Sequence, residues 1–326
     1  MIYRVFKSNI PLVVLLLFPV LAILSLKEWI TPSDHIIEQS SPIYSFFFST
    51  ISQSLFLNYA TAFLLTITTA IMLNWLININ ELFDRQTFLP SLIYVITIGS
   101  FPKFSQLNPI LIANFFLVIA VWRLFQVKRD ASASKEMFDS AFFIALAALF
   151  YTPFLFFFLL TWVCLIIFRP FVWREWLLAL FGFCFPIAVS AALYFVFNQL
   201  LDFDFYFNWE GTYKADIFTE NVIIRSGASS LILMNFILAA YASFSKFSTN
   251  TLRFKRLLTL FAFLGVISIL AMLYCRFISN EEVYPIFIAL PSALFFTFYY
   301  QNSKSFIASV MFYLTLGFSL VNIYFF

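Results

Sequence analysis

The sequence has few charged residues. Asp, Glu, Lys and Arg together make up 11% of its 326 residues, whereas a soluble domain carries roughly 25%. Charges this sparse cannot cover a surface that faces water, and 63% of the residues are hydrophobic. The composition therefore excludes an ordinary soluble domain and predicts a protein whose natural solvent is lipid.

Histidine and cysteine are also scarce. His35 is the single histidine, and Cys164, Cys184 and Cys275 each lie inside an apolar run without CxxC spacing. This pattern excludes an ordinary His-rich metal site. We expect the three cysteines to be small, buried hydrophobic residues.

Flexible residues are few, since only 6 residues are Gly and 12 are Pro, whereas 49 are Phe. A chain of this kind has little room for linkers, so we expect a single transmembrane domain over residues 1–326. The net charge of +3 is small, and no basic block alternates with aromatic residues. Nothing in this pattern indicates a nucleic-acid partner.

Long apolar runs fill most of the chain. A bilayer core of roughly 30 Å needs about 20 apolar helical residues to cross it. The runs between charged or turn-rich breaks predict an all-α polytopic membrane protein with eleven transmembrane helices, the first of them uncleaved because no small-residue cleavage site follows it. The predicted spans are residues 9–26, 53–77, 87–101, 107–126, 137–150, 153–168, 176–197, 228–244, 257–275, 283–300 and 305–325.

Residues 137–168 can be read in two ways. The run is too long for one straight span and short for two, and Tyr151, Thr152 and Pro153 lie at its middle. Proline removes a backbone donor and disfavours a helical conformation in the residue before it. We therefore favour two short helices hinged at this point, with one kinked and tilted span as the alternative.

The distribution of cations sets the orientation. With the N-terminus in the cytoplasm, most of the 19 Lys and Arg residues fall on the cytoplasmic side, as in known inner-membrane proteins. The exceptions are Lys27, Lys103, Lys214, Arg225 and Arg276. Merging residues 137–168 into one span would move Arg169 and Arg174 outside. The prediction is a multi-pass inner-membrane protein with a periplasmic C-terminus.

Two predicted outer loops, residues 27–52 and 198–227, are long enough to carry chemistry. The first contains Glu28, Asp34 and Glu38. A carboxylate partly desolvated at a membrane surface can act as a general base. Polar residues are also the ordinary composition of a surface loop, so both interpretations stay open.

The second outer loop contains Asp202 and Asp204, whose DxD spacing places both carboxylates on one side of an extended segment. Such a pair can hold a divalent cation, the one cofactor that the sequence suggests. The same loop alternates charges with Phe, Tyr and Trp, which equally suits an element lying in the membrane interface.

Few polar residues occur within the spans. Asn74, Asn114 and Asn235 are expected to form hydrogen bonds between helices. The stretch "FRPFVWREWLLALFGFCFP" places Arg169 and Arg174 beside two tryptophans, which predicts an anchor at the level of the cytoplasmic headgroups.

The order of these parts over about residues 1–200 resembles the membrane core of the GT-C glycosyltransferases. It consists of a first span, an acidic first outer loop, the hinged pair "FDSAFFIALAALFYTPFLFFFLL" and the turn "FRPFVWREW" that leads into "LLALFGFCFPIAVSAALYF". The Phe-rich style also resembles a polytopic membrane-protein family of Bacteroidota. The first resemblance implies a transferase that uses a polyprenyl-phosphate-linked sugar on the outer side of the membrane.

GT-C enzymes usually carry the catalytic carboxylate in the first outer loop. The resemblance implies Asp34 for this role, with Glu28 and Glu38 in reserve. It also implies that basic outer residues bind the lipid phosphate, and the candidates are Lys103, Lys214 and Arg276. The alternative function is a non-catalytic subunit or scaffold that contacts other membrane proteins, which the sparse polar residues favour.

Overall fold

The long apolar runs are helical wherever the structure describes them. The computed structural model describes residues 5–7, 11–31, 41, 43, 44, 46–48, 54–83, 85–128, 132–196, 232, 234–241, 252–277, 286–302 and 306–324. Within these ranges the secondary structure is helical and contains no strand, which confirms the all-α prediction.

The α-helices of the first half that the structure describes in full lie between residues 17 and 125. They are α2 (Leu17–Ile30), which follows the 3-10 helix η1 (Pro11–Leu16), α4 (Leu55–Ile79), α5 (Leu89–Gly99) and α6 (Pro109–Phe125). The short 3-10 helix η2 (Pro102–Ser105) joins α5 to α6. Asn108 fixes the start of α6, because its side chain accepts a hydrogen bond from the Leu111 amide at 2.9 Å and Pro109 then occupies the first turn.

The second half continues the same pattern. Its helices are α7 (Ser134–Phe150), η3 (Thr152–Phe158), α8 (Leu159–Phe168), α9 (Trp173–Val196), α12 (Leu252–Phe277), α13 (Ile286–Asn302) and α14 (Phe306–Tyr324). Residues 232 and 234–241 are also helical, within the predicted span 228–244.

Four helical segments are long and apolar enough to cross a membrane. They are Pro11–Ile30, Leu55–Ile79, Trp173–Val196 and Phe254–Cys275. The shorter apolar helices are Leu89–Gly99, Pro109–Phe125, Thr152–Phe168, Ile286–Gln301 and Ser309–Tyr324. The long apolar helices are those of a membrane protein, while the number of crossings stays a prediction.

The break predicted at the middle of residues 137–168 is confirmed. α7 ends at Phe150, Tyr151 is extended with φ −147° and ψ 111°, and η3 begins at Thr152 with Pro153 in its first turn. The chain then reverses, because the residue after α8 lies beside the connection that leads into α7, where the Arg169 Nη1 donates to the Lys128 carbonyl at 3.4 Å. Residues 134–168 therefore form two antiparallel arms.

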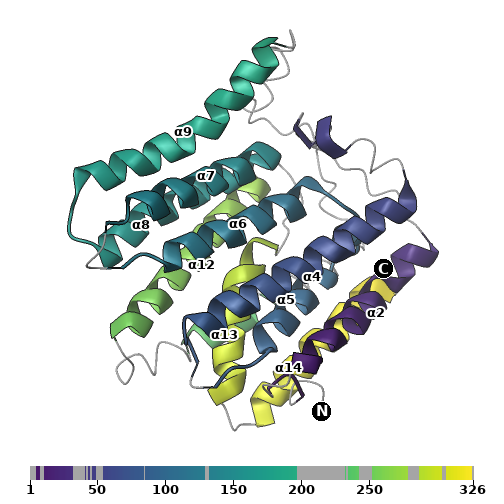
Figure 1. The fold of residues 1–326 in the computed structure, drawn as a ribbon. Coiled ribbons are helices and arrows are strands. Elements are labelled where there is room, and N and C mark those ends of the chain that lie inside the picture. Colours follow the sequence, from purple (N-terminus) through teal and green to yellow (C-terminus); the bar gives the residue numbers. More distant parts are fainter. Residues whose placement is uncertain are drawn as a thin grey trace.

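α5 is buried along its whole length and packs against α2, α4 and α13 (Figure 1). α6 lies between α4 and α7, and α12 packs against α8 and α13. α9 lies at the periphery, where it packs mainly on α7 (Figure 1). The bundle is thus built around α5, with α9 as an outer layer.

Gly182 allows α9 to approach α7 closely. A Cβ atom at this position would lie 2.5 Å from the Phe138 carbonyl oxygen, so only glycine fits without moving the backbone. Small residues at such contacts are typical of membrane helix pairs. The opposite face of α9 is exposed and carries Cys184. The prediction of burial is therefore confirmed for Cys164 and Cys275 and wrong for Cys184, because α9 has neighbours on one side only.

The connections between helices gather at two ends of the bundle. At one end, the Phe88 amide donates to the Phe6 carbonyl at 2.9 Å and the Lys7 Nζ donates to the Gln301 carbonyl at 2.9 Å. At the other end, the Tyr324 hydroxyl donates to the Ile23 carbonyl at 2.6 Å. The first described residues and the end of α14 thus lie at opposite ends.

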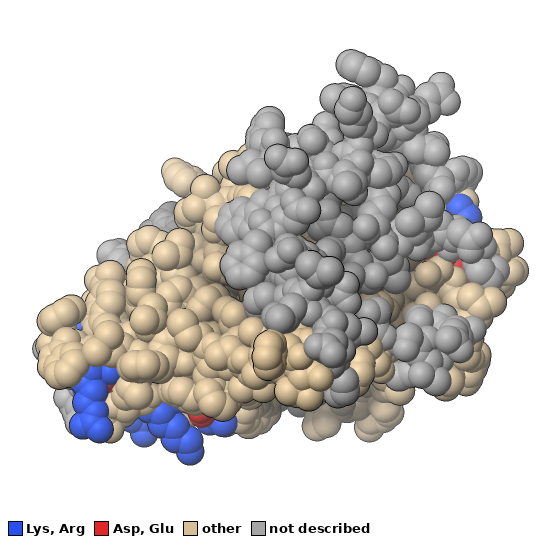
Figure 2. Space-filling model, turned by 90° about the horizontal axis from the view of Figure 1, so that it is seen from above, with Lys and Arg blue, Asp and Glu red and all other residues tan. Residues whose placement is uncertain are grey.

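Lys and Arg side chains gather at one end of the molecule (Figure 2). This is the end that holds the α6–α7 connection and the α8–α9 turn (Figure 1). Arg174 is exposed there, in agreement with the predicted headgroup anchor. Arg169 is mostly buried. Its side chain is only 10% exposed because it forms an ion pair with the buried Glu175.

Candidate functional site

The acidic first outer segment begins inside a helix. α2 continues to Ile30 and ends at Thr31, next to Pro32, which disfavours further helix. Glu28 therefore belongs to the last turn of α2. The predicted loop over residues 27–52 was wrong at its start, because the helix continues to Ile30. The Glu28 side chain is only 4% exposed. A carboxylate this buried is uncommon unless it is paired.

The other predicted carboxylates lie outside the described residues. These are Asp34 and Glu38 in the first loop and Asp202 and Asp204 in the second. His35 and Lys214 lie outside them as well, and Arg276 falls in the last turn of α12 with its side chain outside the described part.

Lys103 lies on η2 and is half-buried. η2 packs against α2, α4 and α5, so Lys103 and Glu28 come from elements that touch. The approach of α2 to α5 is close, since a Cβ atom on Gly99 would lie 2.8 Å from Leu24 Cδ1. The fold therefore brings a predicted acid and a predicted phosphate-binding cation to the same end of the bundle.

A set of hydrogen bonds holds the connection between η2 and α6. The Leu107 amide donates to Asn58 Oδ1 at 2.7 Å, and the Leu107 carbonyl accepts from the Tyr44 hydroxyl at 2.8 Å. Gln106 Nε2 donates to the Tyr59 hydroxyl at 3.0 Å. Burial raises the pKa of Tyr44 to about 12, so this hydroxyl remains a neutral donor at physiological pH.

Trp29 extends this site toward α4. Its ring lies 5.7 Å from the ring of Tyr59 and 6.3 Å from that of Phe56, between centroids. The sequence reasoning missed Tyr44, Asn58, Tyr59 and Gln106. The sequence did show them as amide and hydroxyl side chains near the ends of apolar runs, and these ends were all predicted to lie on the outer side of the membrane.

The site combines a buried carboxylate, a lysine and aromatic side chains. A carboxylate can accept a proton, and an ammonium group can hold a phosphate. Among the residues that the structure describes, no three His, Cys, Asp or Glu side chains gather as a metal site requires. Asp202 and Asp204, the two carboxylates predicted to bind a divalent cation, lie outside that part.

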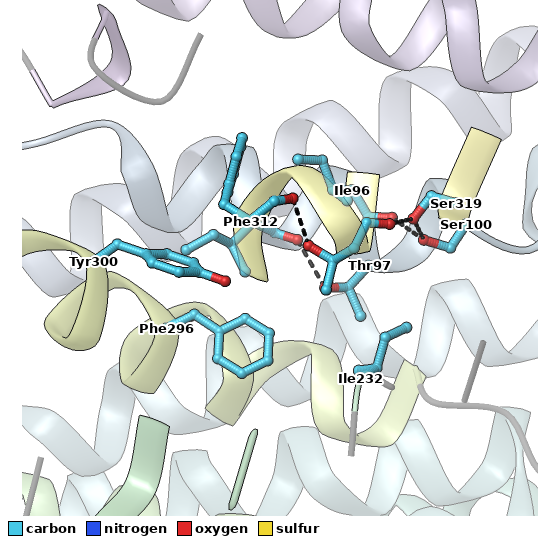
Figure 3. A pocket seen from close by; sticks show the side chains of 10 residues that line it. Ile96, Thr97, Ser100, Ile232, Phe296, Tyr300, Phe312 and Ser319 are labelled. Carbon is cyan, nitrogen blue, oxygen red and sulfur yellow. Dashed lines mark hydrogen bonds between the residues drawn. The ribbon is translucent and has the colours of Figure 1, made fainter. Parts of the chain in front are cut away.

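A second polar region lies between α5, α13 and α14. Figure 3 shows Thr97, Ser100, Tyr300 and Ser319 around a pocket whose other walls are mostly apolar side chains. Ser100 and Ser319 share a hydrogen bond of 2.6 Å, and Asn322 Nδ2 donates to the Ser100 carbonyl at 2.7 Å. The pocket leaves about 20 Å³ open to the centre of a water molecule, room for roughly one water. It is too small for a sugar.

The predicted bonds of the intramembrane amides are confirmed at one position. Asn114 Nδ2 donates to the Tyr94 hydroxyl at 2.8 Å and joins α6 to α5. Asn74 and Asn235 are both buried, and the Asn74 Oδ1 has no hydrogen-bond partner among the described residues. Asn114 therefore links two helices, and in the described part the three amides form no continuous polar path.

Comparison with known proteins gives no relative. No family model, no curated protein and no solved structure matches this chain.

Proposed function

We propose that the protein is a GT-C-like transferase of the inner membrane that moves a sugar from a polyprenyl-phosphate donor to an acceptor on the periplasmic side. The chain would cross the bilayer eleven times with its N-terminus in the cytoplasm. Support comes from the gathering of Lys and Arg at one end of the bundle (Figure 2), which is expected of the cytoplasmic end. The α2–η2 end would then face the periplasm.

The observation that carries the transferase proposal is the burial of Glu28 on a helix that packs against the Lys103-bearing η2. An acid and a cation at the outer ends of neighbouring helices are what transfer from a lipid phosphate requires. The first outer segment would supply the base. The resemblance to GT-C enzymes assigns this role to Asp34, whereas burial beside η2 favours Glu28.

The proposed step is a displacement at the anomeric carbon of the sugar. The carboxylate removes the proton of the acceptor hydroxyl, whose oxygen forms a new bond to that carbon. The bond from the carbon to the phosphate oxygen breaks, and polyprenyl phosphate leaves with the electron pair. Lys103, together with Lys214 or Arg276, would stabilise the charge that develops on the phosphate. A divalent cation on Asp202 and Asp204 could assist.

Sugar transfer in proteoliposomes tests this function. With a radiolabelled polyprenyl-phosphate sugar, we expect one of Asp34→Asn, Glu28→Gln and Glu38→Gln to lower the rate at least about 100-fold, because loss of a general base typically costs 10² to 10⁴. Lys103→Gln should lower it as well. The matched control is Lys27→Gln, which removes a half-buried lysine from the same end without loss of rate.

Two results would count against the proposal. One is a wild-type protein that transfers no sugar from any of a panel of polyprenyl-phosphate donors. The other is full activity in all three acidic variants, since the base would then lie elsewhere. Both readings require that the variants insert at wild-type levels, which the amount of folded protein recovered in detergent reports.

A second candidate function is a non-catalytic subunit of a membrane assembly, and α9 favours it. This helix packs on one side only, and its outer face exposes Phe181, Phe185 and Phe195 at 62%, 54% and 67%. Such a face can contact lipid or another membrane protein. A photo-crosslinking residue at Phe181 should then capture one defined protein in the membrane, whereas crosslinks to lipid alone would remove this candidate.

A further inference from the structure

Three exposed cations surround the α8–α9 turn. They are Lys128 after α6, Lys135 in the first turn of α7 and Arg174 in the first turn of α9. Their positions are fixed by a buried ion pair, because Arg169 Nη2 lies 2.7 Å from Glu175 Oε1 and Arg169 Nε lies 3.2 Å from Glu175 Oε2.

This ion pair ties the two connections together. Glu175 Oε1 accepts a hydrogen bond from the Ala133 amide at 2.9 Å, just before α7. Arg169 Nη1 donates to the Lys128 carbonyl at 3.4 Å, just after α6. The backbone that carries Lys128 and Lys135 is therefore held against the turn that carries Arg174.

The carboxylates of this region are mostly neutralised. Glu175 is occupied by Arg169, and Asp139 Oδ2 lies 3.5 Å from Arg123 Nε. Glu136 is the remaining acidic residue on the first turns of α7. The region therefore carries a net positive charge over the described residues, and its exposed cations can accept an anion.

Aromatic side chains flank the same cations. Phe171 and Trp173 are 77% and 67% exposed, and the Phe171 ring lies 5.6 Å from Trp176 between centroids. Large aromatic rings exposed beside Lys and Arg are typical of the headgroup level of a bilayer, where the ring meets the acyl chains and the cation meets the phosphate.

We propose that this surface, formed by Lys128, Lys135, Arg174, Phe171 and Trp173, binds the headgroup of an anionic phospholipid of the cytoplasmic leaflet. Three cations on two adjoining connections match a lipid with two phosphates better than a zwitterionic one. The proposal rests on the membrane orientation given above and not on sugar transfer, so the two can fail separately.

Thermal unfolding and native mass spectrometry of the full chain in mild detergent test this site. Added cardiolipin should stabilise the protein and remain bound, whereas phosphatidylethanolamine and inorganic phosphate should not. Each neutralised cation should weaken cardiolipin binding about fivefold, since one cation near an anionic lipid contributes on the order of 1 kcal/mol. The variant carrying Lys128→Gln, Lys135→Gln and Arg174→Gln should thus bind roughly 100-fold more weakly.

The matched control is Lys27→Gln at the other end, which should keep wild-type affinity for cardiolipin. Phe171→Ala together with Trp173→Ala should also weaken binding while the three cations remain. The proposal is overturned if the triple variant binds cardiolipin as tightly as the wild type, or if inorganic phosphate or phosphatidylethanolamine stabilises the protein equally well.

Discussion

Replacing Arg169 with glutamine is expected to lower the free energy of unfolding by about 3–5 kcal/mol, because it leaves a buried carboxylate without its partner. The Glu175 side chain is 3% exposed, and both of its oxygens accept from the Arg169 guanidinium. Glutamine cannot neutralise the charge or bridge both oxygens. The change should appear as a large drop in the midpoint of thermal unfolding in detergent and in the yield of folded protein.

Arg174→Gln provides the control for this experiment. Arg174 is five residues away on the same turn but exposed, so its replacement should change the free energy of unfolding by no more than about 0.5 kcal/mol. Replacing the pair together, with Arg169→Met and Glu175→Leu, should recover much of the loss, because no buried charge then remains. Equal midpoints of thermal unfolding for Arg169→Gln and Arg174→Gln would show that the ion pair does not stabilise the fold.

Replacing Gly182 with alanine should have the second-largest effect. The new methyl group would lie 2.5 Å from the Phe138 carbonyl oxygen, a backbone atom that cannot turn aside. α9 must then move away from α7, the helix on which it mainly packs. Overpacking of this kind typically costs about 1–3 kcal/mol, which the midpoint of thermal unfolding will report.

Gly317 in α14 is the matched control, because a Cβ atom there meets nothing within 4 Å. Gly317→Ala should be neutral or stabilise the protein by up to about 1 kcal/mol, as alanine is the better helix former. If Gly182→Ala lowered the midpoint of thermal unfolding no more than Gly317→Ala does, α7 and α9 would not be in close contact at this position.

Much of the fold could be predicted because lipid simplifies the rules. Every backbone polar group in a bilayer must be bonded within the protein, and a helix is the structure that achieves this inside a single long apolar run. The predicted run 53–77 became α4 at Leu55–Ile79, and the run 107–126 became α6 at Pro109–Phe125. The break at Tyr151 could be predicted for a local reason, the proline that follows two residues later.

Features that depend on three-dimensional neighbours could not be predicted in this way. Arg169 and Arg174 look alike in the sequence, yet only Arg169 faces Glu175 and the α6–α7 connection. Cys184 lies in an apolar run like the other cysteines but faces outward, because α9 is peripheral. An apolar run does not reveal which of its faces meets protein and which meets lipid.

The candidate site could be predicted only in part, because much of it also depends on three-dimensional neighbours. Glu28 was visible as a polar residue after the first span, but its burial requires the packing of α2 within the bundle. Lys103 is brought to the Glu28-bearing helix α2 by η2, a short element of 4 residues that hydropathy does not reveal. Tyr44 and Leu107 are joined across 63 positions in the chain, a contact that no local pattern encodes.

The central claim is that the α2–η2 end, with its acidic segment, faces the periplasm while the cationic end faces the cytoplasm. Cysteine labelling tests it most directly, in a chain whose three cysteines are replaced by alanine. The exposed positions Thr31, after α2, and Lys128, after α6, are each replaced by cysteine and treated with a membrane-impermeant maleimide in spheroplasts. We predict that Thr31→Cys is labelled in intact spheroplasts and Lys128→Cys only after they are lysed. Labelling of both positions from the same side, or in the reverse order, would contradict the claim.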